Sequence, residues 1–466
     1  MKKIAATLLI FHLSMAVFSQ ALISSHPLQL RNPKHSQQLL NGVNSKNQVF
    51  AFASDKDKVT VLKYNHVLFF SDSLSINRPD KAYDFMAGYS FEDNGNPYLY
   101  WASEDFKNIQ SIYFDFENKI NQISTFHPAF KDESVLTTFS ENNAFYILAL
   151  PKKENKLKLY VFKKGIMEEK VLDFSSYAFT TQYGKTQNFN ELLNNGLAVL
   201  DTKFLNPLFE SAGTSKMYLE GNQMILTFDS NTQTQLFKID LAAFSISQQI
   251  IPQQVLVKPA GSSNSYFLQN KLYQVKANAA EIAVASIDLV SGETLKKYYA
   301  DTRDTISFRN SPLLSQTGSQ SGKKIKNSKK FLERLADSDL AITAYKTPDY
   351  VMLTVGGVRT VNSTGGIIIG ISAGAAMMAT GTGGDISSLF EGQSLQSTYF
   401  ESLFDEKFEH QAVAQKGLAV DFISQFLSEN EFELHSVFSH KDYFIVNYYD
   451  PKKKELLMRK FEDVAN

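Results

Sequence analysis

The sequence predicts an all-β protein, and three observations support this. Its 466 residues include 37 Phe and 21 Tyr but one Trp, a composition that suits half-buried pleated surfaces better than helices. Short apolar runs recur along the chain, each bounded by turn-forming residues such as Asn, Gly and Asp, which is the pattern of β-hairpins. Where no insertion intervenes, successive runs open about 47 residues apart, a period typical of propeller blades. We therefore predict a β-propeller with seven blades.

Seven apolar runs, in chain order, open the predicted hairpins. They cover residues 49–52, 98–101, 145–148, 224–228, 272–275, 350–353 and 443–446. Second runs follow after a polar gap at 112–116, 157–162 and 235–241. A hairpin with an apolar face cannot stand alone, and radial repetition of four-stranded blades covers both faces. A pair of stacked sandwiches is the alternative architecture for the same runs.

The spacing between runs widens at three places, where we predict insertions near residues 180–215, 301–340 and 356–395. Long loops on a rigid scaffold often carry function, so these are the first places to look for a functional surface. Two short helices are also predicted. In Lys329–Ala336 the apolar residues fall on one face, and Leu418–Leu427 has the same periodicity.

The stretch Gly356–Gly384 is rich in glycine and free of charge from Thr360 onward. We expect a Gly-rich loop here, because glycine disfavours an isolated helix. A membrane-inserted helix is the alternative, since Gly366, Gly370 and Gly374 recur at every fourth position.

The N-terminus has the pattern of a secretory signal peptide. Met1–Lys3 is a basic start, and the apolar run Ile4–Phe18 is too short to span a bilayer. Small residues at 17 and 19 favour cleavage between Ser19 and Gln20, with a second register ending at Ala21. We therefore expect residues 1–19 to be removed and residues 20–466 to form a single propeller-like domain with its insertions.

The composition limits the cellular compartments and the classes of partner that we expect for this protein. The sequence has no cysteine, so it has no disulfides and no N-terminal cysteine for lipid attachment. We expect an exported protein, periplasmic or secreted, that is not a lipoprotein. A formal net charge of −1 gives no field that would attract nucleic acid. No stable membrane span is expected, no histidine pair has metal-ligand spacing, and nothing in the sequence predicts a cofactor.

One motif points to catalysis. Gly370-Ile371-Ser372-Ala373-Gly374 follows an apolar run and has the Gly-x-Ser-x-Gly form of a nucleophile elbow. The string Gly-x-Ser-Ala-Gly-Ala resembles the nucleophile segment of cyanophycinase-like serine peptidases, and this resemblance implies that Ser372 is a nucleophile.

Possible triad partners of Ser372 follow it along the chain. They are Asp405 or Asp421, then His435 or His440. An elbow requires a parallel α/β sheet, which the hairpins do not supply. We therefore assign no catalytic residue, and the alternative is that Ile367–Ser372 is the second strand of the sixth hairpin.

The function class that follows is a binding or scaffold protein of the cell envelope rather than an enzyme. Its partner would be an envelope protein or an extracellular macromolecule, bound at one rim or through the long loops. The alternative is a secreted hydrolase, either a serine hydrolase built on Ser372 or a carbohydrate-active propeller with acidic residues from different blades at the channel mouth. A carboxylate-lined central pocket would favour the latter, and a channel closed by Tyr and Phe would disfavour both.

Overall fold

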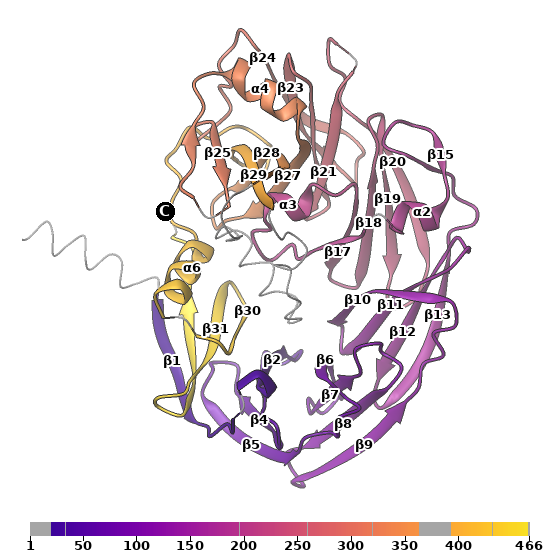
Figure 1. Cartoon of the computed structure of the whole chain (residues 1–466), viewed down its shortest axis with the longest axis vertical. Helices are drawn as coiled ribbons and strands as arrows, with labels where there is room; N and C mark the ends of the chain where they lie inside the picture. Colours follow the sequence, from indigo (N-terminus) through magenta and orange to yellow (C-terminus); the bar gives the residue numbers. More distant parts are fainter. Residues whose placement is uncertain are drawn as a thin grey trace, which may run out of the picture.

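Seven sheets of four or five strands form a ring around a common centre (Figure 1). The computed structural model describes residues 20–464 except 33, 195, 259, 319, 363–392 and 431. Each sheet presents one strand to the centre and one to the outside, which is the arrangement of propeller blades. The protein is a β-propeller, and the fold class predicted from the sequence is confirmed.

Blades 1 to 3 each use four consecutive strands, ordered from the centre outward. Blade 1 comprises β2 (Gln38–Val43), β3 (Val49–Ser54), β4 (Lys58–Tyr64) and β5 (Phe70–Asn77). Blade 2 comprises β6 (Phe85–Phe91), β7 (Pro97–Ala102), β8 (Ile109–Asp115) and β9 (Ile120–Phe126). Blade 3 comprises β10 (Glu133–Glu141), β11 (Ala144–Pro151), β12 (Lys156–Lys163) and β13 (Ile166–Asp173).

Blades 4 and 5 follow the same order, with one addition. Blade 4 comprises β17 (Ser215–Glu220), β18 (Gln223–Asp229), β19 (Gln233–Asp240) and β20 (Ile246–Pro252). A short strand, β16 (Ala198–Leu200), pairs in parallel with β17 and adds a fifth strand on the central side. Blade 5 comprises β21 (Ser262–Leu268), β22 (Lys271–Ala277), β23 (Glu281–Asp288) and β24 (Thr294–Asp301).

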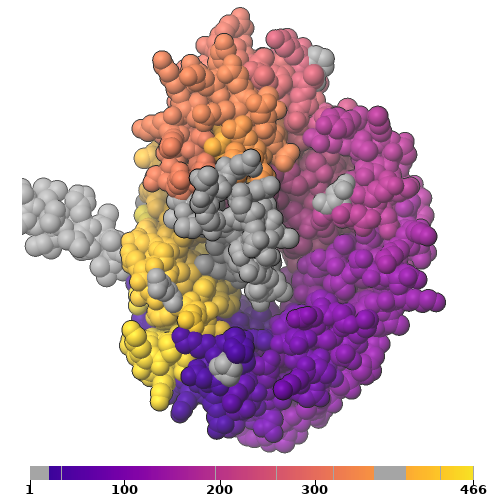
Figure 2. Space-filling model, viewed as in Figure 1, coloured from indigo at the N-terminus to yellow at the C-terminus, as the bar shows by residue number. Residues whose placement is uncertain are grey.

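Blades 6 and 7 recruit strands from outside the simple order. Blade 6 runs outward through β27 (Asp339–Lys346), β28 (Val351–Asn362), β29 (Gln393–Phe404), β25 (Leu314–Thr317) and β26 (Lys323–Lys324). Its outer strands therefore precede its inner strand in the sequence. Blade 7 comprises β30 (His435–His440), β31 (Tyr443–Asp450), β32 (Glu455–Phe461) and β1 (Gln20–Pro27). The first described strand thus pairs antiparallel with the last, and Figure 2 shows the indigo N-terminal part of the chain against the yellow C-terminal part.

The predicted hairpins are the middle strands of the blades. The apolar runs fall on β3, β7, β11, β18, β22, β28 and β31, and the second runs fall on β8, β12 and β19. For the sixth copy, β28 pairs with β29 rather than with the next residues in sequence. The alternative strand Ile367–Ser372 lies outside the described residues.

The middle strands are apolar because both of their faces are buried. On β3, Phe50 and Phe52 belong to the cluster shared with blade 2, whereas Val49, Ala51 and Ala53 belong to the cluster shared with blade 7. Successive side chains of a strand point to opposite faces, so a two-sided core gives a continuous apolar run. Such clusters join every neighbouring pair of blades around the ring.

Both predicted helices are present. α4 (Ser328–Ala336) buries Phe331, Leu332 and Leu335, and the side chain of Asn327 caps its first turn by accepting from the Lys330 amide. α6 (Ala419–Asn430) buries Ile423 and Phe426 against blades 6 and 7. No helix among the described residues is long and apolar enough to cross a membrane.

The predicted insertions contain further short elements. The stretch near 180–215 includes β14 (Phe179–Thr180), β15 (Thr186–Gln187), α2 (Phe189–Asn194), β16 and α3 (Leu208–Ser211). The stretch near 301–340 includes β25, β26 and α4. In the stretch near 356–395, β28 continues to Asn362 and β29 begins at Gln393, so both ends are strand. The predicted Gly-rich loop and its membrane alternative fall mainly on 363–392, outside the described residues.

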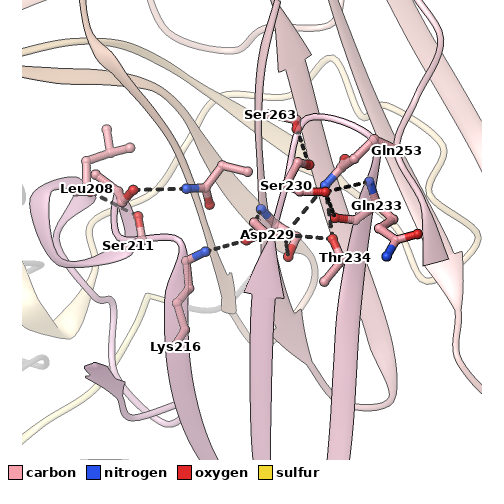
Figure 3. Close-up of polar contacts among 12 residues, drawn as sticks. Leu208, Ser211, Lys216, Asp229, Ser230, Gln233, Thr234, Gln253 and Ser263 are labelled. Atoms are coloured by element: carbon pink, nitrogen blue, oxygen red, sulfur yellow. Dashed lines mark hydrogen bonds and ion pairs between the residues drawn. The ribbon is translucent and has the colours of Figure 1, made fainter. Parts of the chain in front are cut away.

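A buried ion pair joins two strands of blade 4, and its carboxylate also accepts hydrogen bonds from blade 5 (Figure 3). The Nζ atom of Lys216 lies 2.6 Å from Oδ2 of Asp229, and neither side chain is exposed. Asp229 also accepts from the Thr234 hydroxyl and from the amide and hydroxyl of Ser265. Burial lowers the pKa of Lys216, and the charge of Asp229 opposes that shift. The hydrogen bonds compensate much of the cost of burying this carboxylate, and they fix the strand beside which β16 lies.

Candidate functional site

The candidate triad residues are placed as follows. Ser372 lies outside the described residues. His435 and His440 occupy opposite ends of β30, about 16 Å apart at the rise of an extended strand, so one triad cannot use both. His435 has a ring nitrogen, Nδ1, 2.8 Å from the carbonyl of Phe432. His440 is 1% exposed, and burial lowers its pKa.

Asp421 lies at the start of α6. Its carboxylate accepts from the Leu418 amide, 3.3 Å away, which is the contact of a residue that caps a helix. Its carboxylate is also close enough to Glu401 and Asp463 to raise the pKa of both, together with burial. No hydrogen bond between Asp421 and a histidine occurs in the described part of the chain. A role for these residues beside Ser372 stays a prediction.

A different site lies at the centre of the ring. A cavity of about 510 Å³ opens at the carboxyl ends of the inner strands β2, β6, β10 and β30. These ends share one face of the propeller, because each blade is traversed in the same direction. We call this cavity the central pocket. Cavities of this size take small molecules or one end of a larger ligand.

Residues 198–211 form one wall of the central pocket, and we call them the channel segment. β16 begins this segment beside β17, and α3 ends it against β27 and β28 of blade 6. Phe204 packs on Phe444 of blade 7, with 5.0 Å between ring centroids. Leu208 packs on Ala341 and Val358 of blade 6. The segment therefore crosses the centre of the ring from blade 4 to blades 6 and 7.

A buried amide holds the channel segment in place. Asn206 is 5% exposed, and its Nδ2 atom donates to the carbonyl of Asp201 and to the hydroxyl of Tyr266, both at 2.7 Å. Tyr266 belongs to β21 of blade 5. The turn that carries Asp201 is thus fixed to a neighbouring blade by hydrogen bonds that water cannot easily replace.

Three carboxyl groups line the central pocket. Glu141 comes from the end of β10, and Asp201 and Glu210 come from the channel segment. Burial raises the pKa of all three, and that of Glu210 reaches about 7. The charge of Asp201 adds to the shift of Glu141, so these two acids are electrostatic neighbours.

The cation nearest these acids is Lys203. Its charge lowers the pKa of Glu141 and Asp201 against the effect of burial. The described residues contain no ion pair that involves Lys203 or any of the three acids. The pocket therefore holds more acid than base.

The rest of the pocket lining is neutral and mixed. Hydroxyl and amide side chains alternate with aromatic rings around the opening, and they include Asn41, Asn44, Ser90, Thr137, Thr138, Ser140, Ser436, Ser439, Tyr89, Phe139, Phe204 and Phe438. Burial raises the pKa of Tyr89 to about 12, so its phenol is neutral at physiological pH. Among the described residues, no group of three His, Cys, Asp or Glu is arranged to hold a metal ion.

Sequence reasoning found this site only in part. The stretch 180–215, which it singled out, contains Asp201 and Glu210. Glu141 was missed because it lies at the end of an inner strand, β10, whose residues show no clear hydrophobic alternation. The feature that could have revealed Asp201 is the apolar triplet Ala198-Val199-Leu200 directly before it, which is a short strand.

We expect the ionisation of Glu210 to destabilise the folded protein. Its pKa rises from an ordinary 4.5 to about 7 on folding, so the stability that the bound proton contributes is complete below pH 4.5 and is lost as the pH rises through 7. Glu210→Gln should therefore be more stable than wild type at pH 8, by on the order of 2 kcal/mol, and the difference should vanish at pH 4. Urea unfolding followed by circular dichroism at pH 4, 6 and 8 measures this.

The matched control is Glu117→Gln, because Glu117 is exposed on a turn of blade 2. It should unfold like wild type at every pH. Equal stability of Glu210→Gln and wild type at pH 8 would show that Glu210 is not a buried acid.

Comparison with known proteins identifies no family. No protein-family model and no curated protein matches the sequence. One similar solved structure is the Dos1 propeller, with 8% sequence identity over 90% of this chain and 78% of that chain and a TM-score of 0.28. Another is an uncharacterized protein from Listeria monocytogenes, with 10% identity over 92% of this chain and 97% of that chain and a TM-score of 0.29. A protein from Lactobacillus plantarum is similar at 10% identity over 70% of this chain and 82% of that chain, with a TM-score of 0.28. These similarities say nothing about activity.

Proposed function

We propose that this protein is an exported binding protein whose ligand enters the central pocket. The observation that carries the proposal is the pocket itself, which is lined by three acids with raised pKa values and by hydroxyl, amide and aromatic side chains. Carboxyl groups with perturbed pKa values in a concave site are a feature of functional sites. The partner is an extracellular small molecule, or a projecting group of an envelope protein or other macromolecule.

A substitution that fills the pocket tests this proposal. Thr138 on β10 lines the pocket, so Thr138→Trp should block it, whereas Thr125→Trp adds the same ring on the exposed outer strand β9. In a thermal-shift screen of amino acids, peptides, polyamines and oligosaccharides, ligands should raise the melting temperature of wild type and of Thr125→Trp but not of Thr138→Trp. Stabilisation that persists in Thr138→Trp would place the binding site elsewhere.

Export is part of the same proposal. Cleavage after Ser19 would keep every described residue of the closing strand β1, Gln20–Pro27, in the mature chain. When the protein is expressed with its leader, it should be recovered from the periplasm or medium. Its intact mass should be that of a chain whose first residue is Gln20. Ser19→Leu places a large residue before the cleavage site and should leave the leader attached. Recovery of wild type from the cytoplasm with Met1 retained would contradict export.

Glycoside hydrolysis is the second candidate, and Glu210 is the specific observation that favours it. A carboxyl group with a pKa of about 7 suits a general acid, which protonates the leaving oxygen. Glu141 or Asp201, on other elements of the pocket, would then serve as base or nucleophile. Reducing-end release from oligosaccharides should fall by about 10²-fold or more in Glu210→Gln and stay unchanged in Glu117→Gln. Turnover that Glu210→Gln retains would remove this candidate.

A further inference from the structure

We infer that the central pocket takes the cationic end of its ligand, an ammonium or guanidinium group. This inference rests on the proposed function, in which the pocket is the binding site. It adds the chemical class of the ligand, which the fold alone does not specify.

The first argument is the balance of charge inside the cavity. Glu141, Asp201 and Glu210 line it, and Lys203 is the one cationic side chain among the described residues of the lining. A concave site with one predominant sign of charge focuses the field and concentrates ions of the opposite sign. When its acids are ionised, the pocket carries excess negative charge and attracts a cation.

The second argument is that Glu210 has no partner of its own. In the described part of the chain its carboxylate forms no hydrogen bond and no ion pair, and burial alone accounts for its raised pKa. Glu210 is partly buried, and a carboxylate withdrawn from water is stabilised by a partner. The pocket that Glu210 lines has room for one. A bound cation would supply that partner.

Among the described residues, no cationic side chain pairs with Glu210. Lys216 on β17 is paired with Asp229, and Arg359 on β28 donates to Oε1 of Gln396. On the channel segment itself, Lys203 lowers the pKa of Glu141 and Asp201, but burial is the one cause of the raised pKa of Glu210. The neighbouring strands contribute Glu141 on β10, Tyr89 on β6, Tyr266 on β21 and Tyr399 on β29. A cationic ligand would supply the counter-charge that Glu210 lacks among the described residues.

The third argument concerns the kind of cation. No group of three ligating residues in the described part of the chain is arranged for a metal ion. The aromatic rings of Tyr89, Phe139 and Phe204 line the pocket, and aromatic faces attract organic cations. Asn41, also in the lining, is 7% exposed, and its Nδ2 atom has no partner in the structure. That amide is therefore an unsatisfied, buried donor at the edge of the pocket.

The inference predicts a definite pH dependence. Only ionised acids attract a cation, and the pKa of Glu210 is about 7. The ionised fraction of such a group rises about tenfold between pH 6 and pH 8. Affinity for a cation should therefore rise with pH over this range, and binding should release a proton.

Two isosteric probes test the charge directly. N-acetyl-arginine amide carries a guanidinium group, and N-acetyl-citrulline amide replaces it with a neutral urea of the same shape. By isothermal titration calorimetry at pH 8, the arginine probe should bind at least tenfold more tightly than the citrulline probe. Its affinity should fall about tenfold at pH 6, whereas the citrulline probe should not respond to pH.

Variants assign the effect to the pocket. Glu210→Gln should lower the affinity for the arginine probe about tenfold at pH 8 and abolish the pH dependence of that affinity. It should not change the affinity for the citrulline probe. The control Glu117→Gln should leave both probes unchanged. Because Glu210→Gln is expected to be more stable than wild type, lost binding cannot be attributed to unfolding, and circular dichroism of each variant checks this.

The source of the cation is resolved by a third probe. The pentapeptide Ac-Gly-Gly-Arg-Gly-Gly-NH2 presents the same guanidinium from the middle of a chain. Binding within threefold of the arginine probe identifies an exposed side chain of a protein partner as a source. Binding more than tenfold weaker identifies a small molecule.

The outcomes separate this inference from the function on which it rests. If both isosteric probes bind equally and Thr138→Trp blocks both, the pocket is a binding site but not one for cations, and the inference is overturned alone. The same holds if neither probe binds at pH 8 while other ligands of the thermal-shift screen bind in a Thr138-dependent manner. If no ligand depends on Thr138, the proposed function fails, and this inference fails with it.

Discussion

The two-sided burial of the middle strands is the constraint on which the rest of the structure depends. A strand such as β3 has apolar side chains on both faces, so each blade needs a neighbour on each side. Blades stacked in an open row would expose the apolar faces of the two terminal blades, whereas a closed ring buries every such face. The pairing of β1 with β32 completes the last blade and thereby the ring. The centre, which the blades line but do not fill, is a consequence of that closure.

The same constraint explains how far sequence reasoning could go. Runs such as 49–52 and 145–148 were recognisable because two buried faces make them apolar throughout, and they gave the fold and the number of blades. Inner strands such as β10 and outer strands such as β9 are largely polar or exposed, so their residues carry no comparable pattern. The use of β25 as an outer strand of blade 6, and of β1 in blade 7, depends on pairings between distant segments. Local periodicity does not encode such pairings.

The site was less predictable than the fold for a related reason. Asp201 and Glu210 come from an irregular stretch, and Glu141 comes from a different blade. Only the path of the channel segment across the ring brings them together. That path is set by Phe204 and Leu208, which pack on blades 7 and 6, and by Asn206, which bonds to Tyr266 of blade 5. Each contact is ordinary taken singly. Together they hold the acids in a partly desolvated cavity, where electrostatic interactions are stronger than in bulk water.

The pairing of β1 with β32 has a consequence for how the chain is made. The first and last described strands are partners, so the chain must be synthesised through β32 before the ring can close. Contacts between such remote segments are slow to form. A chain that stops early presents the uncovered flanks of two blades, which is the surface that proteases and chaperones recognise in unfinished proteins. Closure of the ring thus couples the burial of the first blade to the synthesis of the last one.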